Sequence, residues 1–228
     1  AAGEREVLYG GSAGGGKSYA MLADPLRYMG HPSFSGLLLR HTTEELRELI
    51  YKSKEIYPQI WKGIKWSERK MQWEAPSGAR LWMSYLDRED DVLRYQGLAF
   101  SWIGFDELTQ WATPYAWNYM RSRLRSVASD LPVYMRATTN PGGPGHQWVK
   151  KMFIDPAPYG RQFDATDIES GNILSYPKGH TKSGQPLFKR RFIPARLSDN
   201  PYLAETGDYE TMLLSLPEHQ RKQLLEGD

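Results

Sequence analysis

The chain has 228 residues, of which 40% are hydrophobic and 25% charged, and its formal net charge is +2. This composition is ordinary for a globular protein, which excludes wholesale disorder, and the length suits one large α/β domain. The absence of cysteine excludes disulfide scaffolds, thiolate zinc sites and a cysteine nucleophile. The sequence contains no apolar stretch long enough to span a bilayer and no signal peptide, so we expect a soluble intracellular protein without a membrane partner.

Hydrophobic patterns along the chain predict strands that alternate with helices. Strands are expected at 6–9, 36–40, 101–106, 133–139 and 188–197, and helices at 17–29, 43–57 (with Thr43 as N-cap), 114–125, 146–153, 204–215 and 217–226. A turn at 76–78 joins 71–75 to 79–85 as a β-hairpin. The alternation predicts an α/β fold with a mainly parallel central sheet flanked by helices.

A glycine-rich segment follows the first predicted strand and precedes the first predicted helix. It matches G-x-x-x-x-G-K-[ST], the pattern of a phosphate-binding loop (P-loop, Walker A), at every specified position. Glycines let backbone N–H groups turn toward phosphate oxygens, Lys17 would reach the β- and γ-phosphates, and the Ser18 hydroxyl would ligate Mg²⁺. The alternative is a flexible glycine turn. The expected nucleotide-binding residues are Gly11, Ser12, Ala13, Gly14, Gly15, Gly16, Lys17 and Ser18.

Two carboxylates end the apolar strand predicted at 101–106, as in a Walker B motif. Beside a phosphate-binding loop, Asp106 can bind Mg²⁺ or its water, and Glu107 can orient and deprotonate the attacking water. The alternative is an exposed helix start, where acidic side chains favour the helix dipole. The sequence lacks the Asn-Lys-x-Asp element that reads guanine, so ATP is the expected nucleotide.

Polar side chains also follow the strand predicted at 133–139. At the tip of a strand in the same sheet, Thr138, Thr139 and Asn140 can sense the γ-phosphate or position water. The alternative is a simple turn, because Asn-Pro-Gly-Gly is favourable turn chemistry.

Basic residues are in excess between 121 and 196, whereas the segment after 197 is acidic. Such an excess can attract nucleic acid through its phosphates, without reading bases. The alternative is a solvated basic face that pairs with the acidic C-terminal segment. The candidate contacts to DNA or to a neighbouring subunit are Arg121, Arg123, Arg125, Lys189, Arg190 and Arg191.

Five segments carry a resemblance to a known family by their order and spacing: GGSAGGGKS, WIGFDELTQ, ATTNPGG, FIPARLSDNP and LPEHQRKQLLEGD. Together they resemble the ATPase domain of the large terminase subunit, the DNA-packaging motor of tailed bacteriophages. The resemblance implies a P-loop NTPase fold of the additional-strand, catalytic-glutamate class. It also implies ATP hydrolysis, with Mg²⁺, that drives double-stranded DNA into a procapsid. Thr138, Thr139 and Asn140 then fall in the motif that couples hydrolysis to movement.

The resemblance further implies a homo-oligomeric ring in the cytoplasm of the infected bacterium, transiently docked on the procapsid, with the portal protein and the small terminase subunit as partners. An arginine must neutralise charge in the transition state. The phosphate loop contains none, so the resemblance favours Arg94, acting on a neighbouring subunit. Arg121, Arg123 and Arg125 are the other candidates, and each of these arginines could instead bind DNA phosphate or a surface carboxylate.

The sequence departs from the family in two respects. Only nine residues precede Gly10, where an adenine-contacting element is usual, and no cluster of nuclease carboxylates follows residue 197. We therefore expect an ATPase core at 1–197, a short helical segment at 198–228 that would lead toward a nuclease domain, and no DNA cleavage. The competing interpretations are a helicase-like nucleic-acid ATPase and a nucleotide-binding assembly module with incidental turnover.

Overall fold

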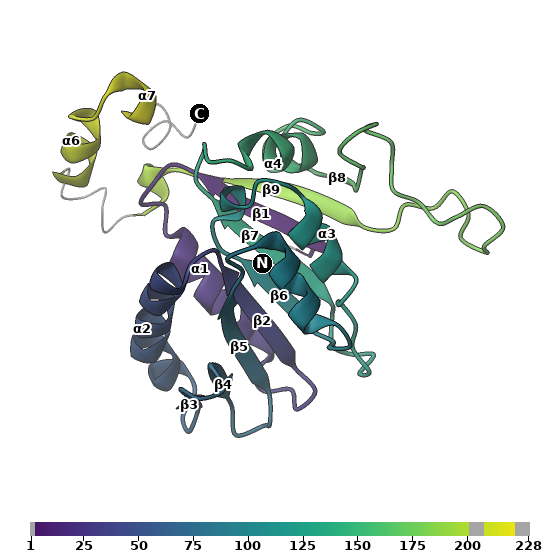
Figure 1. Cartoon of the computed structure of the whole chain (residues 1–228), viewed down its shortest axis with the longest axis horizontal. Helices are drawn as coiled ribbons and strands as arrows, with labels where there is room; N and C mark the ends of the chain where they lie inside the picture. The colour runs from purple at the N-terminus through teal and green to yellow at the C-terminus, as the bar shows by residue number, and fades with distance from the viewer. Residues whose placement is uncertain (1–2, 201–207, 222–228) are drawn as a thin grey trace. The chain divides into compact units, whose positions relative to one another are not determined.

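The chain, a computed structural model, forms two compact units. Figure 1 labels its helices and strands. The structure describes residues 3–200 and 208–221. The first unit comprises residues 1–17, 108–113 and those from 137 onward, and the second comprises 18–107 and 114–136. No helix among the described residues is long and apolar enough to cross a membrane.

The second unit is built on parallel strands. Strand β2 (Ser35–Arg40) pairs in parallel with β5 (Arg80–Tyr85) on one side and with β6 (Trp102–Phe105) on the other. Strands β4 (Gln72–Glu74) and β3 (Lys65–Ser67) continue the sheet beyond β5 in antiparallel pairing. The predicted hairpin is thus confirmed as β4 and β5, while β3 is an additional strand that the sequence did not predict.

Short helical segments accompany these strands. They are α1 (Lys17–Ala23), η1 (Asp24–Tyr28), α2 (Thr43–Ile60), η2 (Glu89–Tyr95) and α3 (Tyr115–Arg121), where η marks a 3₁₀ helix. The helix predicted at 17–29 therefore ends early and continues as η1. The change occurs next to Pro25, which has no N–H to donate to the preceding turn of an α-helix.

Two further expectations about these helices were wrong. The N-cap of α2 is Thr42 and not Thr43: the Thr42 hydroxyl accepts from the Glu45 N–H at 3.3 Å, and the Glu45 carboxylate accepts from the Thr42 N–H at 3.2 Å. The helix predicted at 114–125 ends at Arg121. Residues 122 and 123 form a turn, in which the Arg123 N–H donates to the Met120 carbonyl at 2.9 Å. Phe100 then exchanges backbone hydrogen bonds with Arg123 and Arg125, each 3.0 Å long, so the helix cannot continue.

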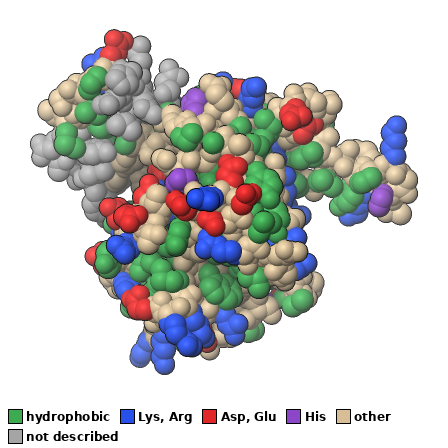
Figure 2. Space-filling model, in the orientation of Figure 1, with side chains coloured by type: hydrophobic (Ala, Val, Ile, Leu, Met, Phe, Trp, Pro, Cys, Tyr) green, Lys and Arg blue, Asp and Glu red, His purple; other side chains and the backbone are tan. Residues whose placement is uncertain are grey.

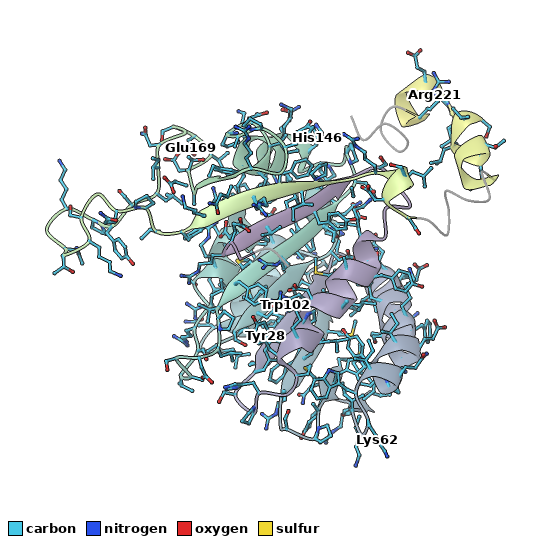
Figure 3. The ribbon with its side chains drawn as sticks, turned by 180° about the vertical axis from the view of Figure 1, so that it is seen from behind. Tyr28, Lys62, Trp102, His146, Glu169 and Arg221 are labelled. Carbon is cyan, nitrogen blue, oxygen red and sulfur yellow. The ribbon has the colours of Figure 1, made fainter. Side chains whose placement is uncertain are left out.

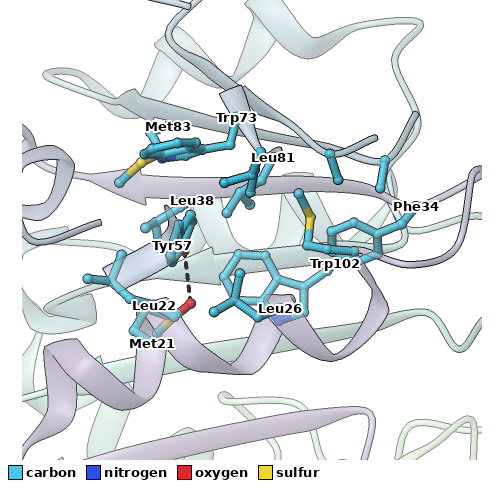
Figure 4. Close-up of a cluster of buried hydrophobic side chains, with 14 of the residues drawn as sticks. Met21, Leu22, Leu26, Phe34, Leu38, Tyr57, Trp73, Leu81, Met83 and Trp102 are labelled. Carbon is cyan, nitrogen blue, oxygen red and sulfur yellow. Dashed lines mark hydrogen bonds between the residues drawn. The ribbon is translucent and has the colours of Figure 1, made fainter. Parts of the chain in front are cut away.

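The core of the second unit lies between α1, α2 and the strands (Figure 4). Met21 and Leu22 of α1 pack in one buried cluster with Leu38 of β2 and Trp102 of β6. The Tyr57 hydroxyl of α2 donates to the Leu22 carbonyl at 2.8 Å, and burial raises the pKa of this tyrosine. Apolar side chains spaced along both helices therefore fix them to the strands.

The first unit is built on β1 (Glu6–Gly11). It pairs in parallel with β9 (Lys189–Ala195), which pairs in turn with the antiparallel β8 (Gln162–Asp164), a strand that the sequence did not predict. Helix α4 (His146–Phe153) has the predicted bounds. The short helices η3 (Leu108–Gln110) and η4 (Leu197–Asp199) complete the described elements before residue 200.

Strand β7 (Tyr134–Thr139) is divided between the units, with residues 134–136 in the second and 137–139 in the first. In the strand order it follows β6 and precedes β1. The order therefore has one strand between the strand of the phosphate loop and the strand of the acidic pair. This confirms the predicted α/β fold of the additional-strand P-loop class.

Residues 165–188 connect β8 to β9 as a long excursion joined by isolated β-bridges, such as that between Ser175 and Pro186. Figure 2 shows Lys and His side chains at the end of this excursion, on the right of the view. Lys178, His180 and Lys182 are all exposed there.

Past residue 200 the structure describes α6 (Asp208–Leu214) and α7 (Glu218–Arg221). These fall within the helices predicted at 204–215 and 217–226, whose remaining parts lie outside the described residues or beyond the helix ends. The domain boundary at 197/198 stays a prediction.

Candidate functional site: a phosphate-binding loop and an acidic strand end

The phosphate-binding loop of the first unit turns through glycines. Gly11, Gly14 and Gly16 have φ values of 131°, 78° and 72°, a region that favours glycine. A Cβ on Gly11 would lie 2.4 Å from the Ala195 carbonyl oxygen, so only glycine fits beside the end of β9. The glycine pattern read from the sequence is thus required by the backbone itself.

Hydrogen bonds hold this loop against its surroundings in the same unit. The Ser12 N–H donates to the Ala195 carbonyl at 2.9 Å, and the Asn200 amide donates to the Gly14 carbonyl at 2.6 Å. The Tyr9 hydroxyl donates to the Gly15 carbonyl at 2.8 Å. Burial and, secondarily, Asp199 raise the pKa of Tyr9. The loop conformation is therefore held by groups that the phosphate-loop pattern does not contain.

Lys17 follows the loop and is buried. Its ammonium donates to the Gly11 carbonyl at 3.3 Å and to the Ser12 carbonyl. The chain thus brings a positive charge against the glycine loop, as a phosphate site requires. Ser18 comes next, at the start of the second unit, and is partly buried.

In the second unit, Asp106 lies at the end of β6 and is fully buried. Its N–H donates to the Leu39 carbonyl at 3.0 Å, and its Oδ2 is 3.3 Å from Nε of Arg40. Arg40 ends the neighbouring strand β2. Arg40 was not among the predicted site residues, although a basic residue at the end of a buried strand was a visible signal.

Glu107 has a φ of +59°, the left-handed region that a residue with a Cβ adopts at a cost. The next residue, Leu108, begins the short helix η3, and the Glu107 side chain is partly buried. Such backbone strain persists only where the surrounding structure enforces it, and it is concentrated at functional sites. The residue predicted as general base is therefore also a strained one.

The predicted coupling residues lie at and beyond the end of β7. Thr138 and Thr139 are buried and Asn140 is partly buried. The Thr139 hydroxyl oxygen is 2.8 Å from that of Thr109, in the segment that follows Glu107. The structure thus joins the coupling segment to η3, and Thr109 is a second site residue that was not predicted from the sequence.

Arg94 lies on η2, where its side chain is about half exposed. Its guanidinium donates to the Tyr85 carbonyl at 2.7 Å and to the Asp91 carbonyl at 3.2 Å, and it is 3.7 Å from the Asp91 carboxylate. These contacts orient an arginine whose side chain remains about half exposed.

The other basic candidates divide into two groups. In the first group each cation has a carboxylate partner. Arg190 is buried and lies 2.7 Å from the Glu6 carboxylate, and Arg191 lies 3.2 Å from the Glu4 carboxylate. Lys189 is half exposed and lies 2.8 Å from the Asp164 carboxylate. Arg121 and Arg123 are partly buried, whereas Arg125 is exposed and donates to two backbone carbonyls, those of Gly97 and Leu98. The run 189–191 therefore has acidic partners within its own unit.

The family model of the phage terminase large subunit matches residues 4–178. This chain belongs to the phage terminase large subunit family. The resemblance found in the sequence is thereby confirmed. No curated protein matches the chain.

Solved structures show the same fold at low sequence identity. The terminase chain is 15% identical to the large terminase of the thermophilic bacteriophage D6E, with a TM-score of 0.68 over 99% of this chain and 48% of that one. The complex of the D6E protein with ADP gives 14% identity, a TM-score of 0.64 and the same coverage. The ATPase domain of the large terminase of Thermus phage P74-26 gives 14% and 0.58, over 100% of this chain and 89% of that one.

This terminase chain thus spans about half the length of the D6E protein and most of the P74-26 ATPase domain. Likeness at this identity shows the fold.

Proposed function

We propose that this terminase chain is an ATPase whose hydrolysis of ATP drives double-stranded DNA into a viral procapsid. The observation that carries the proposal is the glycine loop with Lys17 held against it, in a chain whose family is the phage terminase large subunit. The ADP complex of the D6E relative supports the nucleotide, since that protein has the same fold.

In the proposed mechanism the loop from Gly11 to Gly16 binds the phosphates through its backbone N–H groups. Lys17 exchanges its carbonyl partners for the β- and γ-phosphate oxygens and neutralises their charge. Glu107 orients the attacking water and takes its proton. Because the backbone of Glu107 is held in one strained conformation, its carboxylate would enter the reaction already oriented.

Mg²⁺ would be held by the Ser18 hydroxyl and the Asp106 carboxylate. The hydroxyl and the carboxylate both offer oxygen ligands, which this ion prefers. The ion usually takes only one or two ligands from a protein besides water and phosphate. Once bound, it would neutralise charge on the phosphates. Arg40, beside Asp106, would hold that carboxylate in place.

The transition state also needs an arginine. We assign it to Arg94, which would act on the nucleotide of a neighbouring copy, because its guanidinium is exposed and already oriented. A ring of copies would follow, docked on the procapsid with the portal protein and the small terminase subunit as partners, in the host cytoplasm.

The candidates for contacts to DNA phosphate or to a neighbouring subunit remain Arg121, Arg123, Arg125 and Lys189. Arg190 and Arg191 would act mainly within the fold, through Glu6 and Glu4.

The test is phosphate release from ATP by the unsubstituted chain and by Glu107→Gln, over a range of protein concentrations, with and without linear double-stranded DNA. We expect turnover per subunit to rise with concentration or DNA, and the substitution to lower it by two to four orders of magnitude, the typical contribution of a general base. Binding of a fluorescent ATP analogue should be unchanged by the substitution. Undiminished turnover in Glu107→Gln would remove Glu107 as the base, and absence of ATP binding would overturn the proposal.

A further inference from the structure

The segment directly after Glu107 is held more firmly than a surface loop. Glu107 is left-handed and leads within two residues to Thr109, which is buried in η3. A strained residue keeps its conformation only where the surrounding structure enforces it. Because Thr109 is only two residues from Glu107, the groups that fix Thr109 also restrict the backbone at Glu107.

The Thr109 side chain belongs to a group of two buried hydroxyls and a partly buried carbonyl. Its Oγ1 lies 2.8 Å from that of Thr139, and the Asn140 carbonyl oxygen lies 3.3 Å from the first and 2.9 Å from the second. Each hydroxyl has one proton to donate. One proton joins the two hydroxyls and the other reaches the carbonyl, so both are used.

Backbone contacts attach the same segment to the turn that follows β7. The Gly145 N–H donates to the Thr109 carbonyl at 2.8 Å, and the Trp148 indole N–H donates to the Trp111 carbonyl at 2.9 Å. A Cβ on Gly145 would lie 2.1 Å from the Trp111 carbonyl oxygen, so the approach requires glycine. Residues 109–111 and the turn at 140–145 therefore form one packed assembly within the first unit.

This assembly borders open space. Thr109, Thr139 and Asn140 line a pocket of about 170 Å³ together with His146, whose Nδ1 accepts from the Gly142 N–H at 3.0 Å. Figure 3 labels His146 at the start of α4. The turn therefore has unfilled space on one side, and Thr109 is hydrogen-bonded to it.

We propose that Thr109 is a positioning residue, whose hydroxyl transmits the position of the turn at 140–145 to the carboxylate of Glu107. The inference rests on the proposed function, since it needs Glu107 to act as the base. It extends the set of coupling residues beyond Thr138, Thr139 and Asn140 to Thr109, which follows Glu107 by two residues in the sequence.

The experiment compares Thr109→Val, which keeps the shape but loses the hydroxyl, with Thr109→Ser, which keeps the hydroxyl. Thr181→Val is the matched control, because Thr181 is exposed on the excursion between β8 and β9. We expect Thr109→Val to lower kcat for ATP about tenfold with KM within twofold, and to reduce the stimulation by double-stranded DNA to near one. Thr109→Ser should stay within about threefold of the unsubstituted kcat, and Thr181→Val should match it.

A double substitution tests whether the effect on kcat depends on the hydrogen bond between Thr109 and Thr139. If the two hydroxyls act as a unit, Thr109→Val with Thr139→Val should lower kcat no further than the more damaging single change. Thermal unfolding shows that each variant is folded, and Thr109→Ala takes the place of Thr109→Val should that chain not fold.

The outcomes are distinct. A kcat of Thr109→Val within twofold of the unsubstituted value overturns this inference alone, as does a Thr109→Ser variant no better than Thr109→Val. A raised KM with unchanged kcat also overturns it, because it would place Thr109 in binding. An unsubstituted chain that does not hydrolyse ATP overturns the proposed function and this inference together.

Discussion

The phosphate loop and the end of β6 both contain left-handed backbone, but they accommodate it differently. The loop uses glycine at each such position, and a glycine adopts these angles without steric cost. At the end of β6 the left-handed residue is Glu107, for which the conformation costs about 1–2 kcal/mol. The difference separates two needs: the loop presents backbone N–H groups and needs no side chains, whereas the strand end must present a carboxylate.

The largest effect is expected when Glu107 is replaced by glycine, the residue that the loop has at its left-handed positions. Glu107→Gly should lower ATP turnover at least about a hundredfold, as Glu107→Gln does, because both lose the base. Unlike Glu107→Gln, it should leave the free energy of unfolding unchanged or raised by up to about 1 kcal/mol, since relief of strain offsets the entropy cost of glycine. Urea unfolding of both variants measures this, and a clear destabilisation by glycine would refute the strain at Glu107.

The second effect comes from placing a side chain in the loop. Gly11→Ala should destabilise the chain by roughly 2–4 kcal/mol and weaken ATP binding at least tenfold, because its Cβ would meet the Ala195 carbonyl at 2.4 Å. Gly16→Ala is the control: its φ is +72°, but no atom lies within 4 Å of the added Cβ. It should cost only about 1–2 kcal/mol, the conformational part alone. Equal losses in the two variants would show that the close approach of β9 is unimportant.

The smallest effect concerns what holds the loop. Tyr9→Phe removes the hydroxyl that donates to the Gly15 carbonyl, which should cost about 1 kcal/mol of stability and raise KM for ATP a few-fold. Tyr19→Phe, at an exposed tyrosine, should change neither.

Alkaline pH sharpens the Tyr9 test. Because burial raises the pKa of Tyr9 in the folded chain above its usual 10.0, the folded state holds the proton more tightly than the unfolded one. That contribution is complete below pH 10 and is lost as pH rises through the folded pKa. Stability measured above pH 10 should therefore fall less in Tyr9→Phe than in the unsubstituted chain, and an equal fall would argue against a raised pKa.

Much of the fold could be predicted because its signals are local. Helix α4 has the predicted bounds, and the strands β1, β2, β6, β7 and β9 fall where apolar runs predicted them. The short strands β3 and β8 have three residues each, too few for a period to be recognised, and they exist because a neighbouring strand offers them hydrogen bonds. The Thr42 cap was missed by one residue, since two adjacent threonines offer the same side chain and only the backbone decides between them.

Residues adjacent in the chain are enough to specify the glycine loop with its lysine, the acidic pair at the end of an apolar strand and the alternation of elements, because each of these patterns is local. The partners of these residues follow instead from the three-dimensional packing. It set Arg40 beside Asp106, placed Thr109 against Thr139 across 30 residues, and buried Arg190 against Glu6 across 184. Hydrogen bonds and ion pairs act over a few ångströms in space regardless of separation along the chain, so their partners are fixed only when packing brings the strands together.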